Sequence, residues 1–152
     1  MNLRPVVAPD RWGNLSTMNK PFVRDAALLL FRAVLGLIFV AHGWEKLFIV
    51  GITGTTGQFS AWGVPQPGLS AWICAIAELV GGGLLVVGLL TTIVAGALTL
   101  LMAAAIYFMH LDHGFFVADN GVEYPLLLVV SLIMIVVFGS GRASIDGVLS
   151  RG

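Results

Sequence analysis

The sequence predicts an all-α protein, a four-helix transmembrane bundle, on three observations. Of its 152 residues, 58% are hydrophobic and 11% are charged, whereas about 25% of the residues in a typical soluble domain are charged. The hydrophobic residues gather in four stretches, and a helix needs roughly 20 residues to cross a bilayer. The basic residues lie mainly before the first stretch and after the last. We therefore expect one membrane domain with little chain left for a soluble one.

The four stretches justify the four helices in order, and they are Ala26–Val50, Leu69–Leu90, Thr91–Leu111 and Tyr124–Phe138. The fourth reaches a spanning length if residues 121–141 are included. The second and third stretches adjoin each other, which predicts a tight antiparallel hairpin. Residues 51–68 are rich in glycine and proline, which is typical of a loop or a short interfacial helix. The pair Asn120-Gly121 is a turn signal before the fourth helix.

The ends of the chain predict its orientation. Residues 1–23 are polar and lack the apolar core of a signal peptide, so we expect a soluble N-terminal arm before the membrane domain at residues 24–149. Six of the eight basic residues lie toward the two termini, namely Arg4, Arg11, Lys20, Arg24, Arg142 and Arg151. Basic residues favour the cytoplasmic side. We therefore predict a multi-pass protein of a bacterial cytoplasmic membrane, with both termini in the cytoplasm.

The composition also excludes some functions. The formal net charge is zero, so nucleic acid is not an expected partner. Cys74 is the only cysteine, and the chain therefore has neither an intrachain disulfide nor a Cys-x-x-Cys redox pair.

The central candidate residue is Glu78, a carboxylate in the middle of the second apolar stretch. A charge at bilayer depth costs about 2.5–3.5 kcal/mol on the insertion scale, so Glu78 needs a partner or a proton. Arg32 and His42 lie at depths from which either could reach it, and Lys46 and Glu123 lie near the outer surface, where they could pair with each other. The predicted buried polar cluster is Arg32, His42, Lys46, Glu78 and Glu123.

Three interpretations of this cluster stay open. It is a structural ion pair between the first two helices, or a polar pocket for a quinone head group, a substrate or a proton. In the third interpretation, Arg32 snorkels to the surface and Glu78 is protonated and isolated.

The segment His110-Leu111-Asp112-His113 has some features of a metal site, since imidazole and carboxylate groups are metal ligands. The motif is short, lies at a helix end and lacks a fourth ligand other than Glu123. We therefore expect no metal there, and expect hydrogen bonds that anchor the loop. Small residues at Gly36, Gly81–Gly83 and Ala103–Ala105 predict close helix contacts.

Several runs resemble the DoxX family over about residues 24–149. They are LLLFRAVLGLIFVAHGWEKLF, AWICAIAELVGGGLLVVGLLT with its acid, HGFFVADNGVEYPLLL and the terminal GSGRASIDGVL. The resemblance implies a four-helix integral membrane protein linked to membrane redox systems, including a thiosulfate:quinone oxidoreductase. The family pattern maps onto Arg32, Gly43, Lys46, Glu78, Glu123, Gly141, Arg142, Ser144 and Asp146.

These observations lead to one leading functional hypothesis and two alternatives. The first is a non-catalytic accessory subunit that stabilises a larger respiratory or other membrane redox complex and has no catalytic activity on its own. The second is a quinone-binding component of a membrane oxidoreductase, and the third is a small proton-coupled transporter. We expect no cofactor of its own, and contact with quinone or lipid.

Overall fold

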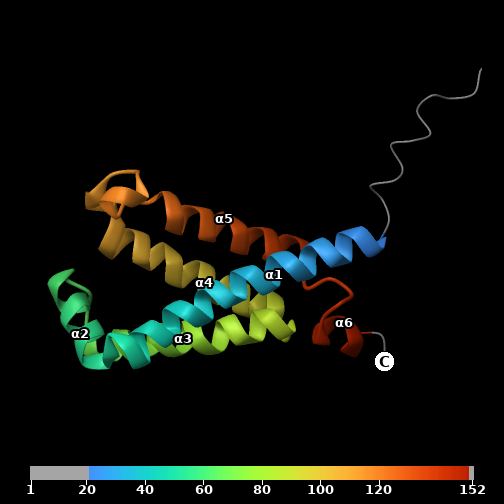
Figure 1. Ribbon diagram of the computed structural model, residues 1–152, viewed down its shortest axis with the longest axis horizontal. Helices are drawn as coiled ribbons and strands as arrows, with labels where there is room; N and C mark the ends of the chain where they lie inside the picture. Colours follow the sequence, from blue (N-terminus) through green and yellow to red (C-terminus); the bar gives the residue numbers. More distant parts are fainter. Residues whose placement is uncertain (1–20, 151–152) are drawn as a thin grey trace, which may run out of the picture.

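The computed structural model describes residues 21–150, which form helices joined by short turns (Figure 1). Within that range there is no strand. Three helical segments are long and apolar enough to cross a membrane, namely Phe22–Ile49, Pro67–Val87 and Thr91–His113. A fourth apolar helix, Glu123–Phe138, is shorter. The predicted all-α fold with four apolar helices is therefore confirmed.

The elements follow one another in a simple order. The bundle consists of α1 (Pro21–Trp44), α3 (Pro67–Val87), α4 (Thr91–Ala105) and α5 (Glu123–Phe138), and two short helices are α2 (Gly51–Ala61) and α6 (Ile145–Leu149). π-Helical segments extend α1 as η2 (Glu45–Ile49) and α4 as η3 (Ile106–His110). The 3₁₀ turns η4 (Leu111–His113) and η5 (Val117–Asp119) lead to α5.

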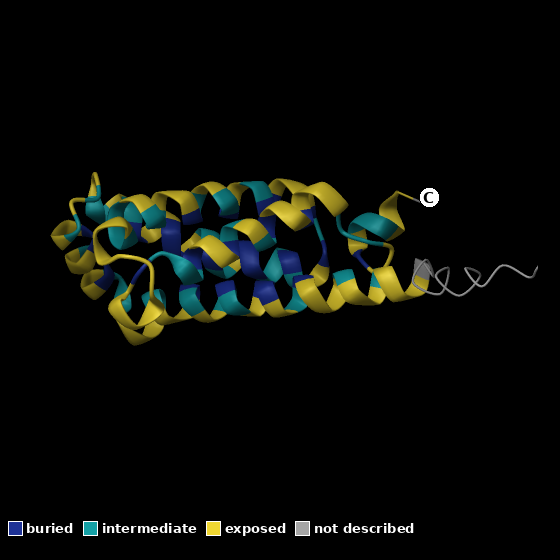
Figure 2. Ribbon diagram, turned by 90° about the horizontal axis from the view of Figure 1, so that it is seen from above, coloured by how far each residue is buried: buried dark blue, intermediate teal, exposed yellow. Residues whose placement is uncertain are grey.

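The helices pack in pairs, α1 mainly against α3 and α4 mainly against α5. Figure 2 shows the buried residues along the inside of the bundle and exposed residues on its outside. The core is formed by apolar side chains such as Phe39, Leu85, Leu98 and Leu132. Large apolar side chains such as Ile93 point outward, which suits contact with lipid tails as apolar as leucine.

The connections agree with the turn chemistry in the sequence. The α3–α4 hairpin is confirmed: Gly88 ends α3 at φ 74° and Leu90 precedes α4 at φ 51°. Residues 51–61 form the short helix α2. Asn120 adopts φ 63° in the turn before α5. Glycine and asparagine tolerate this left-handed backbone better than other residues. The sequence therefore favours it at Gly88 and Asn120, whereas Leu90 adopts it against the preference of its side chain.

Both ends of the described chain lie at one end of the bundle, where α6 folds back beside the start of α1 (Figure 1). We call this the terminal end, and we call the opposite end, with α2 and residues 111–122, the loop end. This arrangement fits four crossings, while the orientation in the cell stays a prediction. Residues 21–23 belong to α1, and the rest of the predicted arm lies outside the described residues.

Candidate functional site

The close contact between α1 and α3 brings the site together. A Cβ atom added at Gly43 would lie 2.5 Å from the Leu79 nitrogen and 2.8 Å from the Ala75 oxygen. Nearer the terminal end, a Cβ at Gly36 would lie 2.6 Å from the Gly82 oxygen. Only glycine fits backbones this close. The residue about one helical turn after Gly43 therefore directs its side chain toward α3.

That side chain is Lys46, and it forms an ion pair with Glu78. Lys46 Nζ lies 2.7 Å from Glu78 Oε2, and Glu78 is only 3% exposed. The other carboxylate oxygen, Oε1, lies 3.5 Å from the Cys74 sulfur, one turn earlier on α3. Both oxygens of the buried carboxylate thus have partners, as buried charges require.

Two features orient Lys46. It lies in the π-helix η2, and π-helical turns inside α-helices frequently occur at functional sites. The hydroxyl of Thr55, buried in α2, donates to the Lys46 carbonyl at 3.2 Å and to the Gly51 carbonyl at 3.0 Å. Helix α2 therefore fixes the backbone from which the ammonium extends.

The ion pair lines a cavity of about 220 Å³ in the loop-end half of the bundle. Its polar lining comprises His42, Lys46, Cys74, Glu78, His110, Asn120 and Tyr124. Phe39, Met102 and Leu128 also line it, and all three belong to the buried apolar core. A ligand in this cavity would thus meet charged and polar groups on some sides and the packed core on another.

Two histidines and a tyrosine add hydrogen-bonding groups to the cavity wall. His110 Nδ1 lies 2.7 Å from the Asn120 carbonyl, and because a carbonyl only accepts, Nδ1 carries the proton. In neutral His110 the other nitrogen, Nε2, is therefore an acceptor. The His42 ring lies 6.4 Å from the Tyr124 ring between centroids, and His42 Nδ1 is 3.7 Å from Glu45 Oε2.

The structure changes the predicted pairing within the cluster. Glu78 is paired with a cation of the first membrane helix, but that cation is Lys46 and not Arg32 or His42. The expected Lys46–Glu123 pair is wrong, because Glu123 Oε1 accepts the Val117 N–H at 2.8 Å. Lys46 is directed toward α3 instead, because it follows Gly43 on the face of the helix that packs against α3.

The segment from His110 to His113 anchors a loop through the His110 bond to Asn120, as expected. Asp112 and His113 are exposed. Among the described residues no group of three or more His, Cys, Asp or Glu side chains is placed to hold a metal ion.

Arg32 belongs to a second polar cluster at the terminal end. Its guanidinium is 1% exposed and donates to the carbonyls of Ser140 and Ala143, the latter at 2.8 Å. Asp146 accepts the N–H groups of Leu90 and Thr91 at 2.8 Å each. The motif GRASID thus ties the C-terminal segment to α1 and to the start of α4, and the sequence did not predict these contacts.

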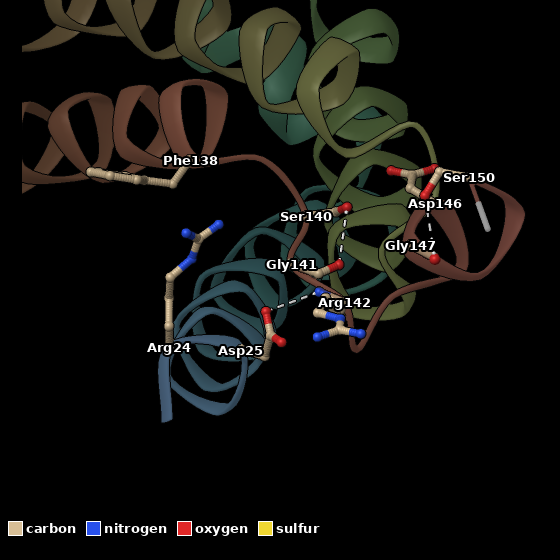
Figure 3. A pocket seen from close by; sticks show the side chains of 9 residues that line it. All are labelled: Arg24, Asp25, Phe138, Ser140, Gly141, Arg142, Asp146, Gly147 and Ser150. Atoms are coloured by element: carbon tan, nitrogen blue, oxygen red, sulfur yellow. Dashed lines mark hydrogen bonds between the residues drawn. The ribbon is translucent and has the colours of Figure 1, made fainter. Parts of the chain in front are cut away.

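Beside this cluster lies an open cleft of about 700 Å³. In Figure 3, Asp25 of α1 faces the loop after α5 and accepts the Arg142 N–H, at 3.1 Å. Burial on its own would raise the pKa of the Asp146 carboxyl, but the hydrogen bonds from Thr91 and Leu90 and the charge of Arg32 outweigh it. The pKa of Asp146 therefore lies below its ordinary value of 3.8.

The fold and the site together define a small multi-pass helical membrane protein with a buried ion pair beside an internal cavity. The sequence model of the family described as DoxX matches residues 27–111. This chain belongs to the DoxX family.

Relatives agree with this assignment. The chain is 33% identical over 135 residues to a Bacillus subtilis protein named "Putative oxidoreductase CatD", covering 89% of this chain and 94% of that one. It is 39% identical over 74 residues to an uncharacterized protein of Haemophilus influenzae, covering 49% of each. An uncharacterized membrane protein of Mycobacterium tuberculosis is 28% identical over 135 residues, covering 82% of each. No solved structure matches significantly.

Proposed function

We propose that the chain is the quinone-binding membrane component of an oxidoreductase and that the head group binds beside Lys46 and Glu78. The observation that carries the proposal is the buried ion pair lining a cavity of about 220 Å³. Pockets for drug-sized ligands measure about 300–1,000 Å³, so this smaller cavity suits a single substituted ring. Apolar walls with a few polar groups are also typical of ligand sites.

The side chains supply what a quinone ring requires. An ammonium has three donors, and Lys46 uses one on Glu78, which leaves donors for a ring carbonyl. Reduction of a quinone to a hydroquinone takes two electrons and two protons, and negative charge develops on the ring oxygens. Lys46 stabilises that charge, since a donor fixed in a dry site acts strongly. Glu78, His42 and His110 line the cavity and are the side chains that would exchange protons with the ring.

The electrons come from a partner redox subunit, the class of partner that the family resemblance implies. The name of the Bacillus subtilis relative, which describes that protein as an oxidoreductase, supports a redox role. We place the assembly in the bacterial cytoplasmic membrane.

The cavity favours this function over the two other hypotheses. A non-catalytic accessory subunit needs packing surface, and the ion pair could hold α1 and α3 in register there, but the internal cavity beside the pair adds nothing to packing. A proton-coupled transporter needs access to Glu78 from both membrane sides in turn, and the cavity meets the packed core at Phe39, Met102 and Leu128.

Equilibrium binding of a quinone to the purified chain in lipid nanodiscs tests the proposal. We expect Glu78→Gln and Lys46→Gln each to weaken binding of decylubiquinone by about tenfold or more, the effect of losing roughly 1.4 kcal/mol. Asp112→Asn makes the matched carboxyl-to-amide change at an exposed residue outside the cavity and should leave binding unchanged. Equal binding of decylubiquinone by wild type and all three variants would refute a site beside Lys46 and Glu78.

A second measurement separates the proposal from the accessory role. Quinone-linked activity is compared per assembled partner complex, with wild type and with Glu78→Gln. Loss of activity from a fully assembled complex supports the quinone site. Unchanged activity per complex, with fewer complexes formed, supports the accessory subunit.

A further inference from the structure

A second cavity adjoins the first one and has a different chemical character. It measures about 260 Å³ and lies between α2, α3 and the α4–η3 segment. We call it the side groove, and its lining is Phe59, Val64, Pro65, Ser70, Ile73, Cys74, Leu101, Ala104, Ala105, Phe108 and Met109. Its one hydroxyl, on Ser70, donates to the Pro65 carbonyl at 2.6 Å. The side groove thus offers mainly hydrocarbon surface to an occupant.

The side groove and the cavity that holds the ion pair have a common wall. Cys74, Ala105 and Met109 line both. Cys74 lies one turn from Glu78 on α3, and Met109 lies in η3 beside His110. The tail of a molecule whose polar end lies at Lys46 and Glu78 would therefore have to pass only these three side chains to enter the side groove.

The side groove opens onto the outer surface of the bundle. Ile73 and Ala104 line it, and both are exposed on helices that are apolar enough to cross a membrane. A third cavity, of about 360 Å³, shares His42, Lys46 and Asn120 with the ion-pair cavity and is lined by polar groups including Glu45 and Gln58. The third cavity is thus a polar route to the ion pair from the loop end, whereas the side groove is an apolar route between helices.

We propose that the side groove binds the hydrocarbon tail of a membrane quinone, whose head group lies beside Lys46 and Glu78. This inference rests on the proposed function and narrows its ligand to a tailed, membrane-resident quinone. The wall that the two cavities share and the apolar lining of the side groove carry it. A water-soluble quinone would use the polar route and gain nothing from the side groove.

The test compares two ligands on three forms of the full chain in lipid nanodiscs. The ligands are decylubiquinone and the same benzoquinone ring without its tail. Ala104→Phe places a large side chain in the side groove, and Ala104 does not line the ion-pair cavity. Ala103→Phe is the matched control, because Ala103 is exposed on the same helix and lines neither cavity. Partition of the tail into lipid is the same for all three forms.

We expect Ala104→Phe to weaken decylubiquinone binding severalfold, because the phenyl ring occupies space that the tail would fill; the displaced tail enters lipid as apolar as the groove, so the loss is one of packing. Its binding of the tailless ring should match wild type, and Ala103→Phe should match wild type for both ligands. The inference is overturned if Ala104→Phe leaves decylubiquinone binding intact or weakens both ligands equally. If wild type binds neither ligand, the proposed function itself fails; if it binds both and only the tail effect is missing, the proposed function stands without this inference.

Discussion

Lys46 Nζ on the first membrane helix lies 2.7 Å from Glu78 Oε2 on the second, and the carboxylate is almost fully buried. A pair in this position holds two helices in one register and also presents charge to the adjoining cavity. The same two residues thus have a structural and a proposed functional role, and mutations can separate the two.

The structural role predicts a strong asymmetry between single and double mutants. Lys46→Met leaves the Glu78 charge buried without its cation, which typically costs about 3–5 kcal/mol. Lys46→Met combined with Glu78→Leu removes both charges and should recover most of that loss. The half-exposed pair of His42 and Glu45 is the comparison, and Glu45→Gln should cost at most about 1 kcal/mol. Thermal melting of the purified protein measures each. A double mutant no more stable than Lys46→Met would contradict the pairing.

The glycine contact predicts a position-specific effect of one added methyl group. Gly43→Ala should destabilise the protein, because the new Cβ would lie 2.5 Å from a backbone nitrogen of α3. Gly83→Ala makes the same change on α3 where nothing lies within 4 Å, and helix propensity favours alanine there by about 1 kcal/mol. Melting temperatures should fall for the first and hold or rise for the second. The same fall in both would mean that α1 and α3 do not meet at Gly43.

The terminal cluster predicts a dependence on pH below about 4. The pKa of Asp146 is lower in the folded protein than its ordinary value of 3.8. The carboxylate therefore contributes stability above that value, and the contribution is lost as the pH falls through the folded pKa. Asp146→Ala should cost about 1 kcal/mol at neutral pH, the usual loss of a helix cap, and should make stability less sensitive to acid. Hydrogen exchange at Leu90 and Thr91 reports the change, and unchanged exchange in the mutant would refute the cap.

Topology is predicted from the basic residues and is testable with single cysteines. Ser150 directly follows α6, which lies at the terminal end (Figure 1), and Asn120 belongs to residues 111–122 at the loop end. Native Cys74 is buried. We expect a membrane-impermeant thiol reagent to label the Asn120→Cys protein, and not the Ser150→Cys protein, in intact cells. Labelling of Ser150→Cys from outside would reverse the orientation.

The sequence predicted the four helices because hydrophobic length and turn residues are local signals. It also identified Glu78 as the residue that needs a partner, since an acid in an apolar run is costly wherever it lies. The sequence predicted Arg32 or His42 as its partner and placed Lys46 near the surface with Glu123. The prediction missed Lys46 because depth along a helix does not show how far a long side chain reaches.

The same limit applies to the contacts between distant segments. Thr55 binds the Lys46 carbonyl, and Asp146 caps α4 from 55 positions away. The family resemblance marked Asp146 without its role, and nothing in the sequence marked Thr55 or Tyr124. Cavities also depend on how side chains fill the space between helices, so the cavity beside the ion pair became visible only in three dimensions.

The most direct test of a quinone site beside Lys46 and Glu78 is covalent labelling with a photoreactive azidoquinone, followed by peptide mapping. The account predicts label on the residues that line the ion-pair cavity, in α3 around Cys74 and Glu78 and in η3 at Met109 and His110. Excess unlabelled quinone should suppress that label, and Glu78→Gln should reduce it strongly. Label confined to the outward faces of the helices, unaffected by competitor and equal in Glu78→Gln, would contradict the account.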